Sequence, residues 1–410
     1  MKTTGIICEY NPMHRGHEKM IKLLRGGGTG TVVCLMSGNF VQRGEPAIID
    51  KYDRAAAAVR SGADLVLELP FPWSSGSARY FAEAGVFILD AIGVRNIAFG
   101  SESADVGLLR AAAEISAGEN YTGFFGEKAE ENEGFASGYF AALNEKLAMR
   151  ADGRLLPNDI LGLEYMRASL VLDTDTEFTV IKREGAGYHD TDALTCLPSS
   201  TALRAAVRRG ELATGLTDAS ADILRLAVSD GRAPACLEAL GQAVLYRFRS
   251  WEGSELAEFA ECGGGVSGRL CRAARESGTL EGMLSAASTK KYTDSRLRRA
   301  VIFAMTKTVR ADLLARPAYT LCLPQMRGEG NLCRRCVKQR GYPFLHDPRR
   351  RSALKRIYRR TREMQRGRPG LCSRARHFTR FHCLIRVLQE NFCAARRCVY
   401  KIVIDLFHIV

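Results

Sequence analysis

The stretch Gly-Ile-Ile-Cys-Glu-Tyr-Asn-Pro-Met-His-Arg-Gly-His-Glu-Lys-Met, residues 5–20, joins a strand pattern to a helix start and decides the fold. Its first four residues are a short apolar run typical of a buried strand, and an Asn-Pro pair follows as a turn. The helix begins near His14, where backbone N–H groups have no partner within the helix and attract phosphate. His14 and His17 are three residues apart, so both can reach one anionic group, and Gly16 leaves room for a nucleotide.

Further apolar runs alternate with helical spacing along the first half of the chain. The expected strands are 30–36, 64–69, 95–102 and 178–182, and the expected helices include 50–60, 77–92 and 199–209. This alternation predicts an α/β fold with a doubly wound parallel sheet, whose ligands bind at the carboxyl ends of the strands. Helical spacing without strands follows over 212–228, 233–249, 268–287 and 295–315, which predicts a second, α-helical domain.

The overall composition is that of a globular protein with substantial cores. The chain has 410 residues, of which 46% are hydrophobic and 25% charged. No apolar run is long enough to span a bilayer, and the N-terminus lacks the basic-then-apolar pattern of a signal peptide. We therefore expect a cytoplasmic protein without a membrane partner; the sequence gives no indication of an oligomeric state.

The excess of positive over negative charge lies in the last segment of the chain. Residues 321–410 hold 22 Lys and Arg against 5 Asp and Glu, whereas residues 1–320 hold 37 against 40, so the net charge of +14 does not by itself indicate a nucleic-acid partner. Seven of the thirteen cysteines also lie there, including the pair Cys333 and Cys336. One CxxC without a second pair is too little for a zinc site, and no metal site is predicted.

The His-x-Gly-His pattern at residues 14–17 resembles the ATP-binding signature of the nucleotidyltransferase and class I aminoacyl-tRNA synthetase superfamily. With its flanks and the segments 36–47, 156–162, 181–190 and 290–293, the chain resembles one family, the tRNA(Met) cytidine acetate ligases, over residues 1 to about 320. Met13 stands where phenylalanine is usual, Arg15 where asparagine is common, and Pro198 precedes the Ser/Thr run that follows. Of these three departures from the family pattern, only Pro198 affects the geometry of a loop, the one before the Ser/Thr run.

The resemblance implies a Rossmann-like nucleotidyltransferase fold and an ATP-dependent ligase. Acetate would be activated as acetyl-adenylate, with Mg²⁺ accompanying ATP, and the acetyl group transferred to the exocyclic amine of the wobble cytidine of elongator tRNA(Met), giving N4-acetylcytidine. His14 and His17 would stabilise charge on the phosphates. Ser199-Ser200-Thr201-Ala202-Leu203-Arg204 resembles the second superfamily signature, in which Arg204 would neutralise the departing pyrophosphate.

The resemblance also implies a set of ATP contacts along the chain. From the residues alone, Asn158 is an ordinary helix N-cap and Arg183 a solvated surface cation. The implied ATP-binding residues are Ile7, Cys8, Glu9, Tyr10, Asn11, Pro12, Met13, Arg15, Gly16, Glu18, Lys19, Met20, Gly100, Asn158, Arg183, Ser200 and Thr201.

Three parts of the chain are expected to differ in role. Residues 1–210 would form the ATP-binding domain, residues 211–320 an α-helical tRNA-binding domain, and residues 321–410 an Arg/Cys-rich segment. The basic residues predicted to contact tRNA lie in the helical domain and are Lys290, Lys291, Arg296, Arg298 and Arg299.

The family resemblance stops abruptly near Thr320, and we predict that the residues beyond it are translated in the wrong reading frame. Codons allowed for residues 320–331, read one base earlier, can spell SVLAANERGRE, which resembles the family at that point. Codons allowed for residues 354–358 can likewise spell LEADI. The alternative is a genuine basic, RNA-binding tail.

Two other functions use the same signatures. A nucleotidyltransferase could join a nucleotide to a small phosphorylated metabolite without contacting RNA, and a catalytically idle protein could keep the fold and bind RNA only. ATP–pyrophosphate exchange separates the three hypotheses: it would require acetate in the ligase, the metabolite in the transferase, and would be absent in the idle protein.

Overall fold

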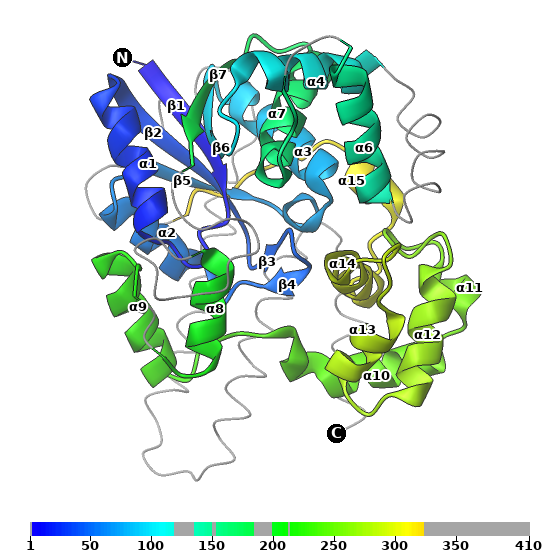
Figure 1. Ribbon diagram of the computed structural model, residues 1–410. Coiled ribbons are helices and arrows are strands. Elements are labelled where there is room, and N and C mark those ends of the chain that lie inside the picture. The colour runs from blue at the N-terminus through cyan, green and yellow to red at the C-terminus, as the bar shows by residue number, and fades with distance from the viewer. Residues whose placement is uncertain (1, 119–134, 150–152, 184–198, 212–213, 324–410) are drawn as a thin grey trace.

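The computed structural model describes residues 2–118, 135–149, 153–183, 199–211 and 214–323. They form a parallel sheet with helices on both faces and a separate group of helices beside it (Figure 1). Within these ranges every helix is too short or too polar to cross a bilayer. The strands and helices are β1 (Lys2–Cys8), α1 (Arg15–Gly26), β2 (Thr29–Ser37), β3 (Phe40–Val41), β4 (Glu45–Pro46), α2 (Lys51–Arg60), β5 (Leu65–Leu69), α3 (Ala78–Ala91), β6 (Asn96–Ser101), α4 (Val106–Gly118), α6 (Phe135–Leu147), α7 (Ile160–Leu172), β7 (Glu177–Lys182), α8 (Ser200–Arg208), α9 (Asp218–Ser229), α10 (Gly241–Ser250), α11 (Gly253–Leu256), α12 (Val266–Glu276), α13 (Leu280–Ala287), α14 (Asp294–Met305) and α15 (Arg310–Leu314).

The sheet has the strand order β5-β2-β1-β6-β7, and all of its neighbouring strands are parallel. All five strands expected from the sequence are present. The central strand β1 pairs with β2 on one side and β6 on the other, with Gly5 opposite both Val33 and Ile97. Because the direction of winding reverses at β1, its carboxyl end is where an open α/β sheet binds ligands.

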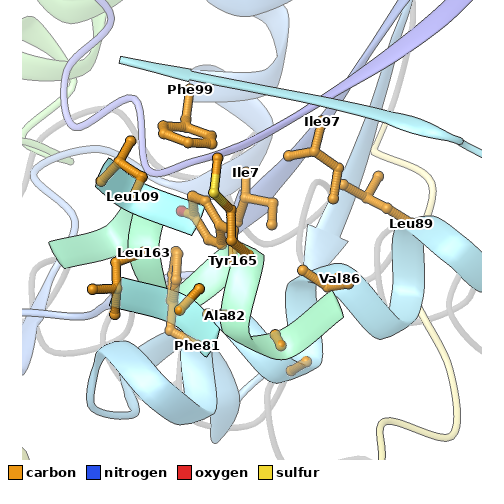
Figure 2. Packing of buried hydrophobic residues seen from close by; sticks show 14 of the residues in the cluster. Ile7, Phe81, Ala82, Val86, Leu89, Ile97, Phe99, Leu109, Leu163 and Tyr165 are labelled. Carbon is orange, nitrogen blue, oxygen red and sulfur yellow. The ribbon is translucent and has the colours of Figure 1, made fainter. Parts of the chain in front are cut away.

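Alternate residues of each strand supply the cores on the two faces of the sheet, as the two-residue period of a strand requires. Ile7, Ile97 and Phe99 face α3, α4 and α7, and Figure 2 shows Ile7 beside Tyr165 of α7 and Ile97 beside Leu89 of α3. The residues between them face α1 and α2 and form a second cluster. The sheet is therefore buried on both sides, and its exposed chemistry is limited to its ends.

The helical module, α10 to α15, has its own core. Buried side chains of α10, α12, α13 and α14 form one cluster, which also includes Phe40 and Phe71 from the sheet domain. The helical segments expected over 268–287 and 295–315 are present, and each is divided into two helices, α12 with α13 and α14 with α15. Thr279 caps the start of α13 by accepting a hydrogen bond from the Gly282 N–H, and Lys307 follows α14 with φ of 53°.

The boundary between the two packing units lies later than residue 211. The α8 and α9 helices, side by side below the sheet in Figure 1, share a hydrophobic cluster with Ile48 and Ile49, and the Ala235 N–H donates to the Ile48 carbonyl at 2.9 Å. Residues 214–235 therefore pack with the sheet domain.

After α15 the chain returns to the sheet. Cys322 pairs antiparallel with Leu67, the Glu68 N–H donates to the Leu321 carbonyl at 2.8 Å, and the Leu323 N–H donates to the Val66 carbonyl at 2.9 Å. This short pairing covers the outer edge of β5. The helical module is thus an excursion that leaves the sheet domain near residue 236 and rejoins it at residue 320. Residues from 324 onward, on which the reading-frame prediction and the CxxC pair fall, lie outside the described residues.

Candidate active site

Two histidines form the start of α1 directly after the β1 loop. His14 is the N-cap residue, and its Nδ1 accepts a hydrogen bond from the Gly16 N–H at 3.1 Å. The Nδ1 of His17 accepts in turn from the His14 N–H at 3.3 Å. This reciprocal arrangement is a capping box in which imidazoles take the places usually held by Ser or Thr and by Glu or Gln.

The capping box determines which ring nitrogens remain for a ligand. Because both Nδ1 atoms accept backbone hydrogen bonds, each neutral ring carries its proton on Nε2. The rings are stacked with centroids 3.6 Å apart. Burial, reinforced by the charge of Arg183, lowers the pKa of His14 to about 4; burial also holds the pKa of His17 well below its usual value, with contributions from His14 and Arg183. Near neutral pH the pair therefore offers two uncharged N–H donors.

Gly16 makes room for this cap. A Cβ at residue 16 would lie 3.0 Å from Cε1 and 3.1 Å from Nδ1 of His14. The sequence predicts space for a nucleotide here, whereas the nearest neighbour of the missing side chain is the His14 imidazole. A side chain at this position would therefore press on the His14 ring and displace it from its present place.

Gly100 and Arg183 lie together at the carboxyl ends of β6 and β7. The Arg183 N–H donates to the Ser101 carbonyl at 2.9 Å, and a Cβ at Gly100 would lie 3.0 Å from Cγ of Arg183. Arg183 is exposed, and among the described residues no carboxylate forms an ion pair with it. Its charge contributes, after burial, to the lowered pKa values of both histidines.

Asn158 is held at the end of β6 by Glu102. Its Nδ2 donates to Oε1 of Glu102 at 2.5 Å and its N–H to Oε2 at 3.2 Å. The adjacent Asp159 is fully buried and accepts from the Ser101 hydroxyl at 2.6 Å and the Glu102 N–H at 2.9 Å. Sequence reasoning missed Glu102 and Asp159, although an Asp next to Asn158 before a helix was a usable signal.

Arg204 is almost fully buried, and its guanidinium group has three polar partners. Its Nη1 donates to the Asn11 carbonyl at 3.0 Å, its Nε lies 3.3 Å from Oε1 of Glu45, and its Nη2 donates to Thr201 Oγ1 at 3.2 Å. In this arrangement it ties the loop after β1 to β4, and its role toward pyrophosphate stays a prediction. Ser200 is half-buried at the start of α8, which is capped by Ser199.

Arg54 is a site residue that sequence reasoning missed. The side chain is fully buried and donates to the carbonyls of Glu9, Ser37, Gly38 and Ile49. Burial lowers its pKa to about 10. It joins the ends of β1 and β2, and the only signal in the sequence was an arginine beside four alanines.

Asn11 presents an unused donor in the same loop. Its side chain is 2% exposed, and its Oδ1 accepts from the Ile48 N–H at 2.9 Å. Its Nδ2 has no hydrogen-bond partner among the described residues. A buried amide without a partner is costly, so a bound ligand that accepts from Nδ2 would remove that cost.

The remaining predicted ATP residues divide between scaffold and surface. Ile7, Tyr10, Pro12 and Met13 are buried in the sheet domain, while Cys8 and Met20 are half-buried. The Glu9 carboxylate accepts from the Gln42 N–H at 2.9 Å. On α1, Glu18 pairs with Lys22 at 3.1 Å, and Arg15 and Lys19 are exposed.

The predicted tRNA residues are also of two kinds. Lys290 and Lys291 are exposed before α14. The arginines of α14 lie next to carboxylates: Arg296 and Arg299 both pair with Glu261, at 3.5 and 3.3 Å, and Arg298 pairs with Asp294 at 2.8 Å. Their net contribution to a basic surface is therefore smaller than the sequence predicts.

Comparisons with known proteins agree with this geometry. The family model described as HIGH Nucleotidyl Transferase matches residues 1–327. A tRNA(Met) cytidine acetate ligase of Syntrophotalea carbinolica is 35% identical over 77% of this chain and 76% of its own, and one of Thermotoga petrophila is 36% identical over 72% and 74%.

Solved structures are similar as well. The crystal structure of Thermotoga maritima TmcAL in its apo form is 28% identical, with a TM-score of 0.80 over 96% of this chain and 95% of that one. The same protein bound with alpha-thio ATP gives a TM-score of 0.78, at 28% identity, over 95% and 94%. The chain therefore belongs to the HIGH nucleotidyl transferase family and, within it, to the tRNA(Met) cytidine acetate ligases.

Proposed function

We propose that this chain is an ATP-dependent ligase that acetylates the exocyclic amine of the wobble cytidine of elongator tRNA(Met), forming N4-acetylcytidine. The observation that carries the proposal is the stacked, neutral His14–His17 pair, which leaves two Nε2–H donors after the carboxyl end of β1, with Arg183 at the carboxyl end of β7 on the same edge of the sheet. The names of the relatives, tRNA(Met) cytidine acetate ligases, support a cytidine of tRNA(Met) as the acceptor.

In the first step, an acetate oxygen attacks the α-phosphorus of ATP. The bond from that phosphorus to the bridging oxygen breaks, pyrophosphate leaves with the electron pair, and acetyl-adenylate forms. Negative charge moves onto the phosphate oxygens during this displacement, and preorganised N–H donors stabilise it. His14 and His17 supply such donors without being charged themselves, and Arg183 supplies the positive charge.

In the second step, the exocyclic nitrogen of cytidine attacks the acetyl carbonyl carbon. The acyl–phosphate bond breaks, AMP leaves, and the nitrogen loses one proton to solvent or to AMP. Asn11 Nδ2 is our candidate for orienting the nucleotide through both steps, because it is a buried donor held by a fixed Oδ1.

Mg²⁺ is proposed as the companion of the triphosphate, where it would neutralise phosphate charge. The described residues contain no group of three His, Cys, Asp or Glu side chains that could hold a metal ion. The fit is therefore to an ion bound mainly by phosphate oxygens and water. We place the reaction in the cytoplasm, where tRNA is present, with the helical module contacting the tRNA.

The test is acetate-dependent exchange between ATP and labelled pyrophosphate, followed by mass spectrometry of nucleosides from tRNA(Met) incubated with enzyme, ATP and acetate. We expect exchange that requires acetate and N4-acetylcytidine in the elongator tRNA. A matched transcript with uridine at the wobble position should remain unmodified. Exchange that proceeds without acetate, or unmodified elongator tRNA after incubation, would overturn the proposal.

A further inference from the structure

Tyr292 is in contact with two arginines of the helical module. The Arg269 guanidinium carbon, from α12, is 5.7 Å from its ring centroid, and that of Arg296, from α14, is 5.4 Å away. The phenol hydroxyl donates to the Gly264 carbonyl, and the side chain belongs to the buried core of the module. The ring is thus a fixed support that holds two cations near each other.

The charge around this ring is not balanced. Arg296 shares its carboxylate, Glu261, with Arg299. Arg269 is exposed, and among the described residues no carboxylate forms an ion pair with it. The exposed Lys291 directly precedes Tyr292. Such a group is self-repelling, and a bound anion would reduce the repulsion.

This cluster is connected to the ATP loop by named contacts. Arg299 donates from Nη1 to the Gln42 carbonyl at 3.5 Å, and the Gln42 N–H donates to the Glu9 carboxylate at 2.9 Å. A Cβ on Gly44 would lie 2.4 Å from the backbone nitrogen of Arg299, so the β3–β4 hairpin and α14 are in direct contact (Figure 1). The cluster is therefore joined, through Glu261, Arg299 and Gln42, to the loop that follows β1.

We propose that Arg269, Tyr292 and Arg296, with Lys291, form a clamp for one backbone phosphate of RNA. The inference rests on the proposed function, which makes RNA a substrate. A planar guanidinium fork matches two phosphate oxygens, and contacts to the backbone fix the position of an RNA without reading its sequence. The clamp adds Arg269 and Tyr292 to the predicted contacts and replaces Arg298, which is paired with Asp294.

Arg269→Gln tests the clamp, because the side chain is exposed and its loss leaves the core intact. Arg275→Gln is the matched control: it removes the same charge from the same helix, at a residue that already pairs with Glu252 at 3.2 Å. The probe is tRNA(Met) transcript, with its Kd measured over a range of salt concentrations. We expect Arg269→Gln to raise Kd about fivefold and to lower the slope of log K against log salt by about 1, as for the loss of one phosphate contact. Arg275→Gln should bind like the parent protein.

Acetate-dependent pyrophosphate exchange should be unchanged in both variants. Equal losses in the two variants, or an Arg269→Gln protein that binds tRNA normally, would overturn the clamp while leaving the proposed function intact. Competition by polyglutamate as effective as by tRNA would also overturn it, because the surface would then be a general anion site. If elongator tRNA is bound but never acetylated and Arg269→Gln still weakens binding, the proposed function fails and the clamp stands.

Discussion

The imidazoles of His14 and His17 gain their donor role from backbone geometry. Each Nδ1 is occupied by a backbone N–H, so the reactive-side nitrogen is a donor whatever the ligand. Each histidine thus has two functions: it caps the start of α1 through Nδ1, and it can donate a hydrogen bond to a ligand through Nε2. A replacement that lacks either group cannot perform both.

Replacing either histidine with alanine removes a preorganised donor to the phosphates. We expect acetate-dependent pyrophosphate exchange to fall by about 10²-fold or more in His14→Ala and in His17→Ala. Thermal melting monitored by circular dichroism serves as the control for folding. Near-normal exchange by a folded His17→Ala protein would show that the pair does not act on phosphate.

The lowered histidine pKa values predict how stability depends on pH. The unfolded chain binds protons on His14 near the ordinary value of about 6.5, whereas the folded chain binds one only near pH 4. Stability from this residue is therefore fully present above about pH 6.5 and is lost as the pH falls towards 4. Urea unfolding at several pH values should show this decline, and His14→Asn should reduce it. An identical decline in the variant would assign the effect to other groups.

Gly16 is predicted to be intolerant of even a methyl group. In Gly16→Ala the new Cβ would displace the His14 ring, and a displaced donor should lower the exchange rate by roughly tenfold or more. Gly26→Ala, at the other end of α1, is the matched control, because a Cβ there meets nothing within 4 Å. Equal activity in the two variants would refute the steric argument.

At the scale of elements, the β3–β4 hairpin is one contact between the sheet domain and α14, beside the packing of Phe71 on Phe303. Gly44 has φ of 74°, and a Cβ there would overlap the backbone of Arg298 and Arg299. We expect Gly44→Ala to destabilise the protein by roughly 2–4 kcal/mol in denaturant unfolding. Gly28→Ala, with φ of 85° and open space around the Cβ, isolates the backbone cost, which should be about 1 kcal/mol. Equal losses of unfolding free energy in the two variants would mean that the hairpin moves away from α14 without destabilising the protein.

The sequence predicted the helices and strands that are determined by residues close together in the chain. The strands are continuous apolar runs, and the start of α1 is fixed by His14 and its neighbours within three residues. Arg204 shows the limit: its partners, the Asn11 carbonyl and Glu45, lie 193 and 159 residues away, so its role as a tie depends on the tertiary fold. Arg54 was missed for the same reason, because its carbonyl partners come from three separate loops.

At the scale of the whole molecule, we predict that the segment beyond residue 323 is translated in the wrong reading frame. The family model ends at residue 327, close to the point where we place the change of frame. We expect resequencing of the gene across the codons for residues 316–330 to reveal a single-base error, after which the corrected frame continues the family pattern. An unbroken frame encoding the tail as printed would contradict this and favour a basic tail.

The return of the chain to β5 has a mechanical consequence for the helical module. A module held by one linker can swing in any direction, but this one is fastened at two places, near residues 236 and 320. The module can rotate about the line through these two chain connections without stretching either of them. The contacts of Gly44 and Phe71 with α14 oppose that rotation, so the module is held against the sheet domain.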